Sequence, residues 1–239
     1  MIMVICVVTS AYFIRGITGF GSGLIAVPLL ALSFPLKFAI PLIVALDFTA
    51  SMAIGGINRK QVDWGEYKLL LPIGLVGGAL GIAALIYLPP TPILIGLGVF
   101  TMFFGFRNVL GLQPVGQIDR VWGIPAGFTG GFTGALFGVG GPPYLMYLSR
   151  RLPDKGQIRA TFSLISASDG VARLIWFAVA GMLLDTKLLM AYLVCLIPMA
   201  FGLYSGNNVH HDITSGGMLK AVGVLLVFSG AMLFLKAVA

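Results

Sequence analysis

Two short glycine-rich motifs interrupt otherwise apolar sequence, one in each half of the chain. FGSG occupies residues 20–23, and FGVG occupies residues 137–140. Several glycines in a row destabilise a helix, so each motif predicts a helix break. Unpaired N–H groups at the start of the returning helix, together with its dipole, would attract an anion. The expected donors are Gly21, Ser22, Gly23 and Leu24 in the first half and Gly138, Val139, Gly140 and Gly141 in the second.

Four charged residues lie inside apolar segments, where an unpaired charge is costly. Arg15 precedes the first motif and has no carboxylate near it in sequence, which favours contact with an anion. Arg173 follows Asp169 by one helical turn, so a local ion pair and substrate contact are both open. Asp47 is the first-half counterpart of Asp169, and both are candidates for coupling to a proton or sodium ion. A structural carboxylate that caps a hairpin tip is the alternative for Asp47.

The sixth apolar segment has an unusually polar beginning, which could line a solute path or bond to backbone and neighbouring helices. Its polar residues are Thr161, Ser163, Ser166 and Ser168. Neither a metal site nor a cofactor is predicted. His210 and His211 form a loop pair without further ligands, and GFGSG lacks the strand and spacing of a dinucleotide motif.

The composition is that of an integral membrane protein. Of 239 residues, 58% are hydrophobic and 10% are charged, and the mean hydropathy is +1.01. The formal net charge of +7 does not indicate nucleic-acid binding, because the basic residues are scattered between apolar segments. Without an H-E-x-x-H motif or a serine-plus-base pattern, we predict that the protein is not an enzyme.

The apolar segments occur in the same order in both halves, which indicates an internal duplication. Residues 1–112 form the first predicted repeat, residues 113–120 a linker, and residues 121–239 the second repeat. Each repeat begins with a broken segment and continues with three unbroken ones. The broken segments are 1–34 and 121–148, and the unbroken segments are 37–56, 66–88, 92–110, 158–182, 188–206 and 216–238.

Length and charge favour broken segments that enter the membrane and return. A continuous helix over residues 1–34 would be about 50 Å long, whereas the hydrocarbon core is about 30 Å thick. With two such hairpins, ten basic residues fall on one face and three on the other, as the positive-inside rule requires. The first group is Arg59, Lys60, Lys68, Arg107, Arg120, Arg150, Arg151, Lys155, Arg159 and Lys220, and the second is Lys37, Lys187 and Lys236.

The predicted fold class is therefore an all-α integral membrane protein with two inverted repeats. Each repeat would contain a broken, re-entrant helical hairpin plus three transmembrane helices, and the odd number of spans inverts the second repeat. Eight full crossings in two parallel repeats are the alternative.

At these residues the chain resembles the sulfite exporter TauE/SafE family, also called the toluene sulfonate uptake permeases. RGITGFGSGLIAVPLL at residues 15–30 and TGALFGVGGPPYLMYL at residues 133–148 are similar to the signatures of its two halves. VDW at residues 62–64 and RATFSLISASD at residues 159–169 extend the resemblance. Ser22 stands where many members have glycine. The resemblance implies a bacterial or archaeal inner-membrane permease for sulfite, organosulfonates or related anions, with the signature loops as binding elements.

Together the residues and the resemblance predict a secondary transporter that moves a small anion by alternating access. An anion channel lined by the two hairpins is the alternative. The expected partners are the anion, the lipid bilayer and a coupling proton or sodium ion, without nucleic acid, and a homodimer is left open. The predicted substrate-binding residues are Arg15, Gly21, Ser22, Gly23, Gly138, Val139, Gly140, Gly141 and Arg173.

Overall fold

The computed structural model describes residues 2–19, 21–54, 60–112, 116–209 and 215–238. Phe20, Arg59, His210 and His211 lie outside these described residues. The described part of the chain is all-α, as predicted, with ten α-helices, one 3-10 helix and no strand. The helices are α1 (Ile2–Thr18), α2 (Ser22–Ala31), α3 (Leu36–Ile54), α4 (Trp64–Tyr87), α5 (Pro90–Val109), η1 (Arg120–Trp122), α6 (Gly123–Phe137), α7 (Gly141–Arg151), α8 (Lys155–Val179), α9 (Thr186–Val209) and α10 (Ser215–Val238).

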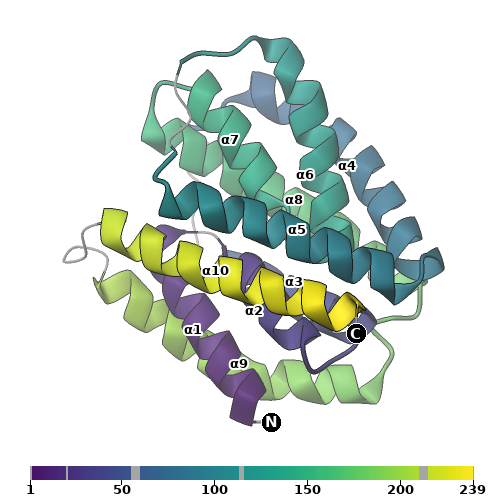
Figure 1. Cartoon of the computed structure of the whole chain (residues 1–239). Coiled ribbons are helices and arrows are strands. Elements are labelled where there is room, and N and C mark those ends of the chain that lie inside the picture. Colours follow the sequence, from purple (N-terminus) through teal and green to yellow (C-terminus); the bar gives the residue numbers. More distant parts are fainter. Residues whose placement is uncertain (1, 20, 55–59, 113–115, 210–214, 239) are drawn as a thin grey trace.

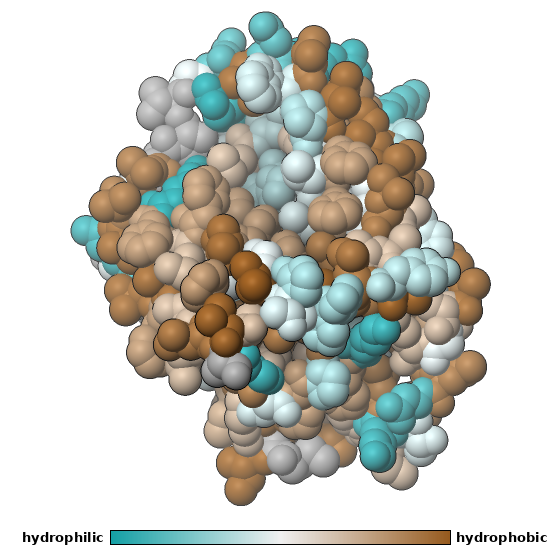
Figure 2. Space-filling model, turned by 45° about the vertical axis from the view of Figure 1, so that its right-hand side comes forward, coloured by the Kyte–Doolittle hydropathy of each residue, from teal (hydrophilic) through white to brown (hydrophobic). Residues whose placement is uncertain are grey.

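Five of these helices are long and apolar enough to cross a membrane: α4, α5, α8, α9 and α10. Their outward faces carry large hydrophobic side chains such as Val76, Phe103 and Phe228. Figure 2 shows that hydrophobic residues cover much of one face of the molecule. Such a surface would be unfavourable in water and is favourable against lipid.

The chain leaves the helical conformation at both glycine motifs. α1 ends at Thr18 and α2 begins at Ser22, while α6 ends at Phe137 and α7 begins at Gly141. Gly21, which precedes α2, has a φ of 94°, a left-handed conformation that glycine adopts without strain. The four helices beside these breaks have 17, 10, 15 and 11 residues. Each is therefore about 15–26 Å long.

Each broken pair of helices returns to the end of the molecule from which it started. The Ser33 hydroxyl, just after α2, donates to the Met3 sulfur at the start of α1 over 3.3 Å. In the second half the Tyr147 hydroxyl of α7 donates to the Arg120 carbonyl oxygen, just before α6, over 3.4 Å. The two helices of each pair are thus in contact, with the glycine break between them in sequence.

The long helices pair across the two halves (Figure 1). α4 of the first half packs along α6 of the second, and α9 of the second half packs along α1 of the first. α4 also contacts α8, α9 contacts α3, and α5 packs along α10. Exchanging the five helices of one half for the corresponding five of the other converts α4–α6 into α9–α1 and α4–α8 into α9–α3, and it leaves the pair α5–α10 unchanged. Each hairpin is therefore supported by a long helix of the opposite half.

Glycines allow these cross-half pairs to approach closely. In the α4–α6 pair, a Cβ atom added to Gly131 would overlap the backbone of Gly74. In the α1–α9 pair, a Cβ atom on Gly16 would lie only 2.9 Å from the Cα atom of Gly206. Close backbone approach through small residues is a common way for helices to associate in lipid.

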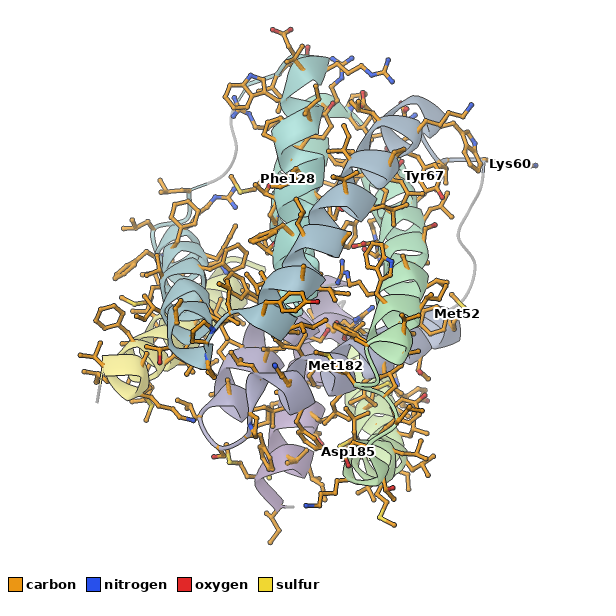
Figure 3. All side chains as sticks on the ribbon, turned by 90° about the vertical axis from the view of Figure 1, so that its right-hand side faces the viewer. Met52, Lys60, Tyr67, Phe128, Met182 and Asp185 are labelled. Atoms are coloured by element: carbon orange, nitrogen blue, oxygen red, sulfur yellow. The ribbon has the colours of Figure 1, made fainter. Side chains whose placement is uncertain are left out.

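The basic residues are separated between the two ends of the molecule. At one end the Lys236 ammonium donates to the Ala31 carbonyl oxygen over 2.9 Å, and the Lys37 ammonium donates to that of Ile86 over 3.0 Å. Figure 3 places Lys60 near the opposite end from Asp185. The end that contains Lys60 also contains the starts of α4, α6 and α8.

At this second end, a buried carboxylate of α4 joins α4 to α7. Glu66, 4% exposed, accepts a 2.6 Å hydrogen bond from the Tyr147 hydroxyl and a 3.0 Å hydrogen bond from Arg151 Nε. The hydrogen bond to Glu66 raises the pKa of the Arg151 guanidinium. These contacts hold the C-terminal end of α7 against the start of α4.

Candidate functional site

The two glycine breaks meet at a cavity of about 590 Å³. All nine predicted substrate-binding residues line it, and so does Asp47. Asp169 does not. The helices α2, α3, α7 and α8 supply most of the wall, so the cavity lies where both halves of the chain contribute.

The first break brings the start of helix α2 to the cavity. Gly21 is the N-cap residue of α2, and because glycine has no side chain it forms no capping hydrogen bond with the first turn. The first-turn N–H groups of Ser22, Gly23 and Leu24 cannot pair within their own helix, and all three residues line the cavity. This end of α2 therefore has the geometry expected of an anion-binding helix start.

The second break differs, because two of its expected donors are used within the fold. The N–H groups of Gly138 and Val139 both bond to the carbonyl oxygen of Thr133, so the prediction that they are free is wrong. A positive φ of 69° at Gly138 turns the chain so that these bonds close the last turn of α6. Gly140 and Gly141 remain beside the cavity, and the two prolines after them lack an N–H group.

The two breaks are in backbone contact with each other. A Cβ atom added to Gly23 would overlap the carbonyl oxygen of Gly138. No side chain fits between the hairpin tips at this point. Gly23 therefore sets how closely the two hairpins approach at the edge of the cavity.

Arg15 has a partner that its sequence neighbourhood does not reveal. Its Nη1 atom lies 2.6 Å from Oδ1 of Asp47, a residue of α3. The same Oδ1 atom accepts hydrogen bonds of 2.6 Å from Tyr12 and from Ser22, the first residue of α2. The contact with Ser22 is the one expected of a structural carboxylate that caps the helix break. Asp47 also lines the cavity, and its side chain is 25% exposed.

Arg173 combines the two roles that its sequence left open. Its Nη2 atom pairs with Oδ2 of Asp169, and its Nη1 atom donates to the Gly134 carbonyl oxygen over 3.1 Å. Arg173 also lines the cavity, whereas Asp169 is fully buried behind it. Arg173 therefore forms a structural ion pair and is also part of the cavity wall.

The two halves place a guanidinium beside equivalent aspartates, but from different helices. Arg173 lies four residues after Asp169 on α8, and the equivalent residue after Asp47 on α3 is Ser51. The Ser51 hydroxyl accepts a 2.7 Å hydrogen bond from Arg15 of α1. Arg15 thus reaches the position in the first half that Arg173 occupies in the second.

Some polar side chains near the start of α8 line the cavity, and others form hydrogen bonds with residues at the start of α4. Ser163 and Ser166 line the cavity. The Thr161 hydroxyl accepts a 2.9 Å hydrogen bond from the Asp63 N–H, and Ser168 shares a 2.9 Å hydrogen bond with Tyr67.

Sequence reasoning did not assign several residues of the cavity wall to the site, among them Phe48, Lys155, Arg159 and Phe162. Lys155 and Arg159 were counted only as topological charges. A signal was available, because both are spaced by helical turns from Ser163, Ser166 and Arg173.

Comparison with known proteins identifies the family. The family model for the sulfite exporter TauE/SafE matches residues 3–233. The probable inner membrane transporter protein TsaS of Comamonas testosteroni is 33% identical over 197 residues, which cover 80% of this chain and 81% of the relative. No solved structure gives a significant match. The chain therefore belongs to the sulfite exporter TauE/SafE family of membrane transporters.

Proposed function

We propose that the protein is a secondary transporter that moves a small anion across the inner membrane of a prokaryotic cell by alternating access. Sulfite, an organosulfonate or a related sulfur-containing anion is the proposed substrate. The observation that carries the proposal is the meeting of two broken helices and two buried arginines at one cavity. A volume of about 590 Å³ is within the usual range for small-molecule sites.

In the proposed membrane arrangement, residues 1–112 and 121–239 are two inverted repeats joined by residues 113–120. The pairs α1–α2 and α6–α7 enter the bilayer and return, so that both glycine breaks lie at bilayer depth. Three observations support this arrangement: the return of each pair to its starting end, the separation of the basic residues and the exchangeable helix pairing. Non-helical backbone at this depth is tolerated because it lines a cavity.

The proposed binding site uses the start of α2 and the two guanidinium groups. The first-turn N–H groups of α2 and the side chains of Arg15 and Arg173 supply the donors. Gly140 and Gly141 allow the anion to approach the second break closely. Charge-assisted hydrogen bonds of this kind are the strong ones for an oxyanion.

A carrier is favoured over a channel by the apolar layer beyond the cavity. Ile25 and Leu30 of α2, Ile40 of α3 and Phe177 of α8 are each at most 2% exposed and belong to one packed core. They lie between the glycine breaks and the end of the molecule that contains Lys37 and Lys236. In this conformation the anion site would be closed to that end, which is one state of an alternating-access cycle.

Flux measurements on purified protein in proteoliposomes test this function. We expect saturable uptake of labelled sulfite or toluenesulfonate, accelerated by unlabelled anion inside the vesicles. Conductance that increases linearly with anion concentration, without such exchange, would support the channel instead. The absence of flux for every sulfur-containing anion would refute both.

Asp47→Asn is expected to uncouple transport. Asp47 lines the cavity and is only partly covered, so a proton or sodium ion can reach it, whereas Asp169 is fully buried. The variant should lose the dependence of uphill accumulation on the proton or sodium gradient and retain anion exchange. Asp169→Asn is the comparison and should retain this dependence. If both variants keep gradient-driven accumulation unchanged, coupling does not involve these carboxylates.

A further inference from the structure

One face of α8 runs along the cavity wall from its mouth to its depth. Lys155, Arg159, Ser163, Ser166 and Arg173 all line the cavity, and their spacings of three, four and seven residues place them on one side of the helix. At about 1.5 Å per residue, this row extends over roughly 27 Å. It contains cations at both ends and hydroxyl groups between them.

The positive charges of the two arginines deep in the cavity, Arg15 and Arg173, are largely neutralised by neighbouring carboxylates. Arg15 is paired with Asp47, and Arg173 is paired with Asp169. Lys155 and Arg159 are exposed, and within the described ranges neither forms an ion pair. The uncompensated positive charge of the cavity wall therefore lies at its mouth, at the N-terminal end of α8.

Arg159 lies close to the first glycine break. Its Nη2 atom is 3.8 Å from the position that a Cβ atom would occupy on Gly19, which follows the last residue of α1. The guanidinium therefore extends from α8 to the first glycine break. An anion that enters between α8 and this break must pass close to it.

We propose that Lys155 and Arg159 form a capture site for the transported anion, distinct from the deep site at the glycine breaks. The captured anion then moves along Ser163 and Ser166 to Arg173. This inference rests on the proposed function. Cations at the mouth of a cavity with low-dielectric walls raise the rate of anion entry, by about 10- to 1000-fold in steered associations. The capture site acts on the rate of entry at one membrane face and not on the maximal flux.

The test compares Lys155→Gln/Arg159→Gln with wild type in membrane vesicles of both orientations. At 10 mM ionic strength, where the Debye length is about 30 Å, sulfite flux at subsaturating concentration should fall about tenfold. Maximal flux should change by less than about twofold, because the deep site is intact. At 1 M choline chloride, where the Debye length is about 3 Å, the two proteins should become equal. The difference should occur only when sulfite is supplied on the face that carries Lys155.

Lys60→Gln/Lys68→Gln is the matched control. Both lysines are exposed near the same end of the molecule, outside the cavity wall, and the change in net charge is the same. This variant should behave as wild type, and Arg159→Lys should retain most of the capture rate. A tenfold loss in the control as well would assign the effect to general surface charge and overturn the proposal.

The outcomes separate this inference from the proposed function. Wild-type vesicles without anion flux would overturn both. Normal wild-type flux with an unaffected Lys155→Gln/Arg159→Gln variant would overturn the capture site alone. A loss of maximal flux that is equal at low and high salt would also overturn it, because a structural role, not steering, would explain that result.

Discussion

Replacing Arg173 with methionine is expected to abolish anion flux and to destabilise the protein. Asp169 is fully buried behind Arg173, so the substitution leaves its carboxylate without a counterion. Breaking a buried ion pair by removing one partner costs about 3–5 kcal/mol. The Gly134 carbonyl oxygen also loses a donor. Thermal unfolding in detergent and flux in proteoliposomes measure the two effects separately.

A second variant separates the binding role of Arg173 from its structural role. Arg173→Met/Asp169→Leu removes both charges, and replacing a buried ion pair with apolar residues is often neutral or stabilising. The double variant should therefore unfold at a temperature close to that of wild type. Its anion flux should remain absent, because the guanidinium that faces the cavity is gone. Recovery of flux together with stability would show that Arg173 only holds the helix.

Gly23→Ala is expected to lower anion affinity about tenfold, which corresponds to about 1.4 kcal/mol. The added methyl group would overlap the carbonyl oxygen of Gly138, so the two hairpin tips must move apart. Overpacking of this kind costs about 1–3 kcal/mol. Because the start of α2 supplies the backbone donors, its displacement disturbs the proposed anion site directly. Sulfite titrations followed by thermal shift give the affinity.

Gly170→Ala is the control for the tip contact. Gly170 also lines the cavity, but its added Cβ atom would lie 3.6 Å from the nearest atom of Phe48, an ordinary van der Waals distance. Alanine is also favoured over glycine within a helix such as α8. This variant should bind sulfite as wild type does. An equal loss of affinity in both variants would contradict the importance of the Gly23–Gly138 contact.

Features that depend on neighbouring residues could be predicted from the sequence. Runs of apolar residues predicted the long helices within a few residues of their ends, because helix length in a membrane protein follows hydrophobic length. Glycine runs predicted the breaks that begin at Gly19 and Gly138. The pair Asp169–Arg173 was likewise accessible, because a spacing of four residues joins side chains on one helix.

Features that depend on packing between helices could not be predicted. The contact of Arg15 with Asp47 joins residues 32 positions apart and requires α1 and α3 to meet at one level. The use of the Gly138 and Val139 N–H groups by Thr133 follows from a backbone angle that composition does not fix.

The pairing of α4 with α6 and of α9 with α1 has a mechanical consequence. A transport cycle needs rigid bodies that move past each other, and tightly packed helices move together. Each such body must therefore contain helices from both halves of the sequence. In the proposed cycle, the boundary between the moving bodies would therefore differ from the boundary between the two proposed repeats. A polypeptide cut between residues 112 and 121 would yield two fragments that are each mechanically incomplete.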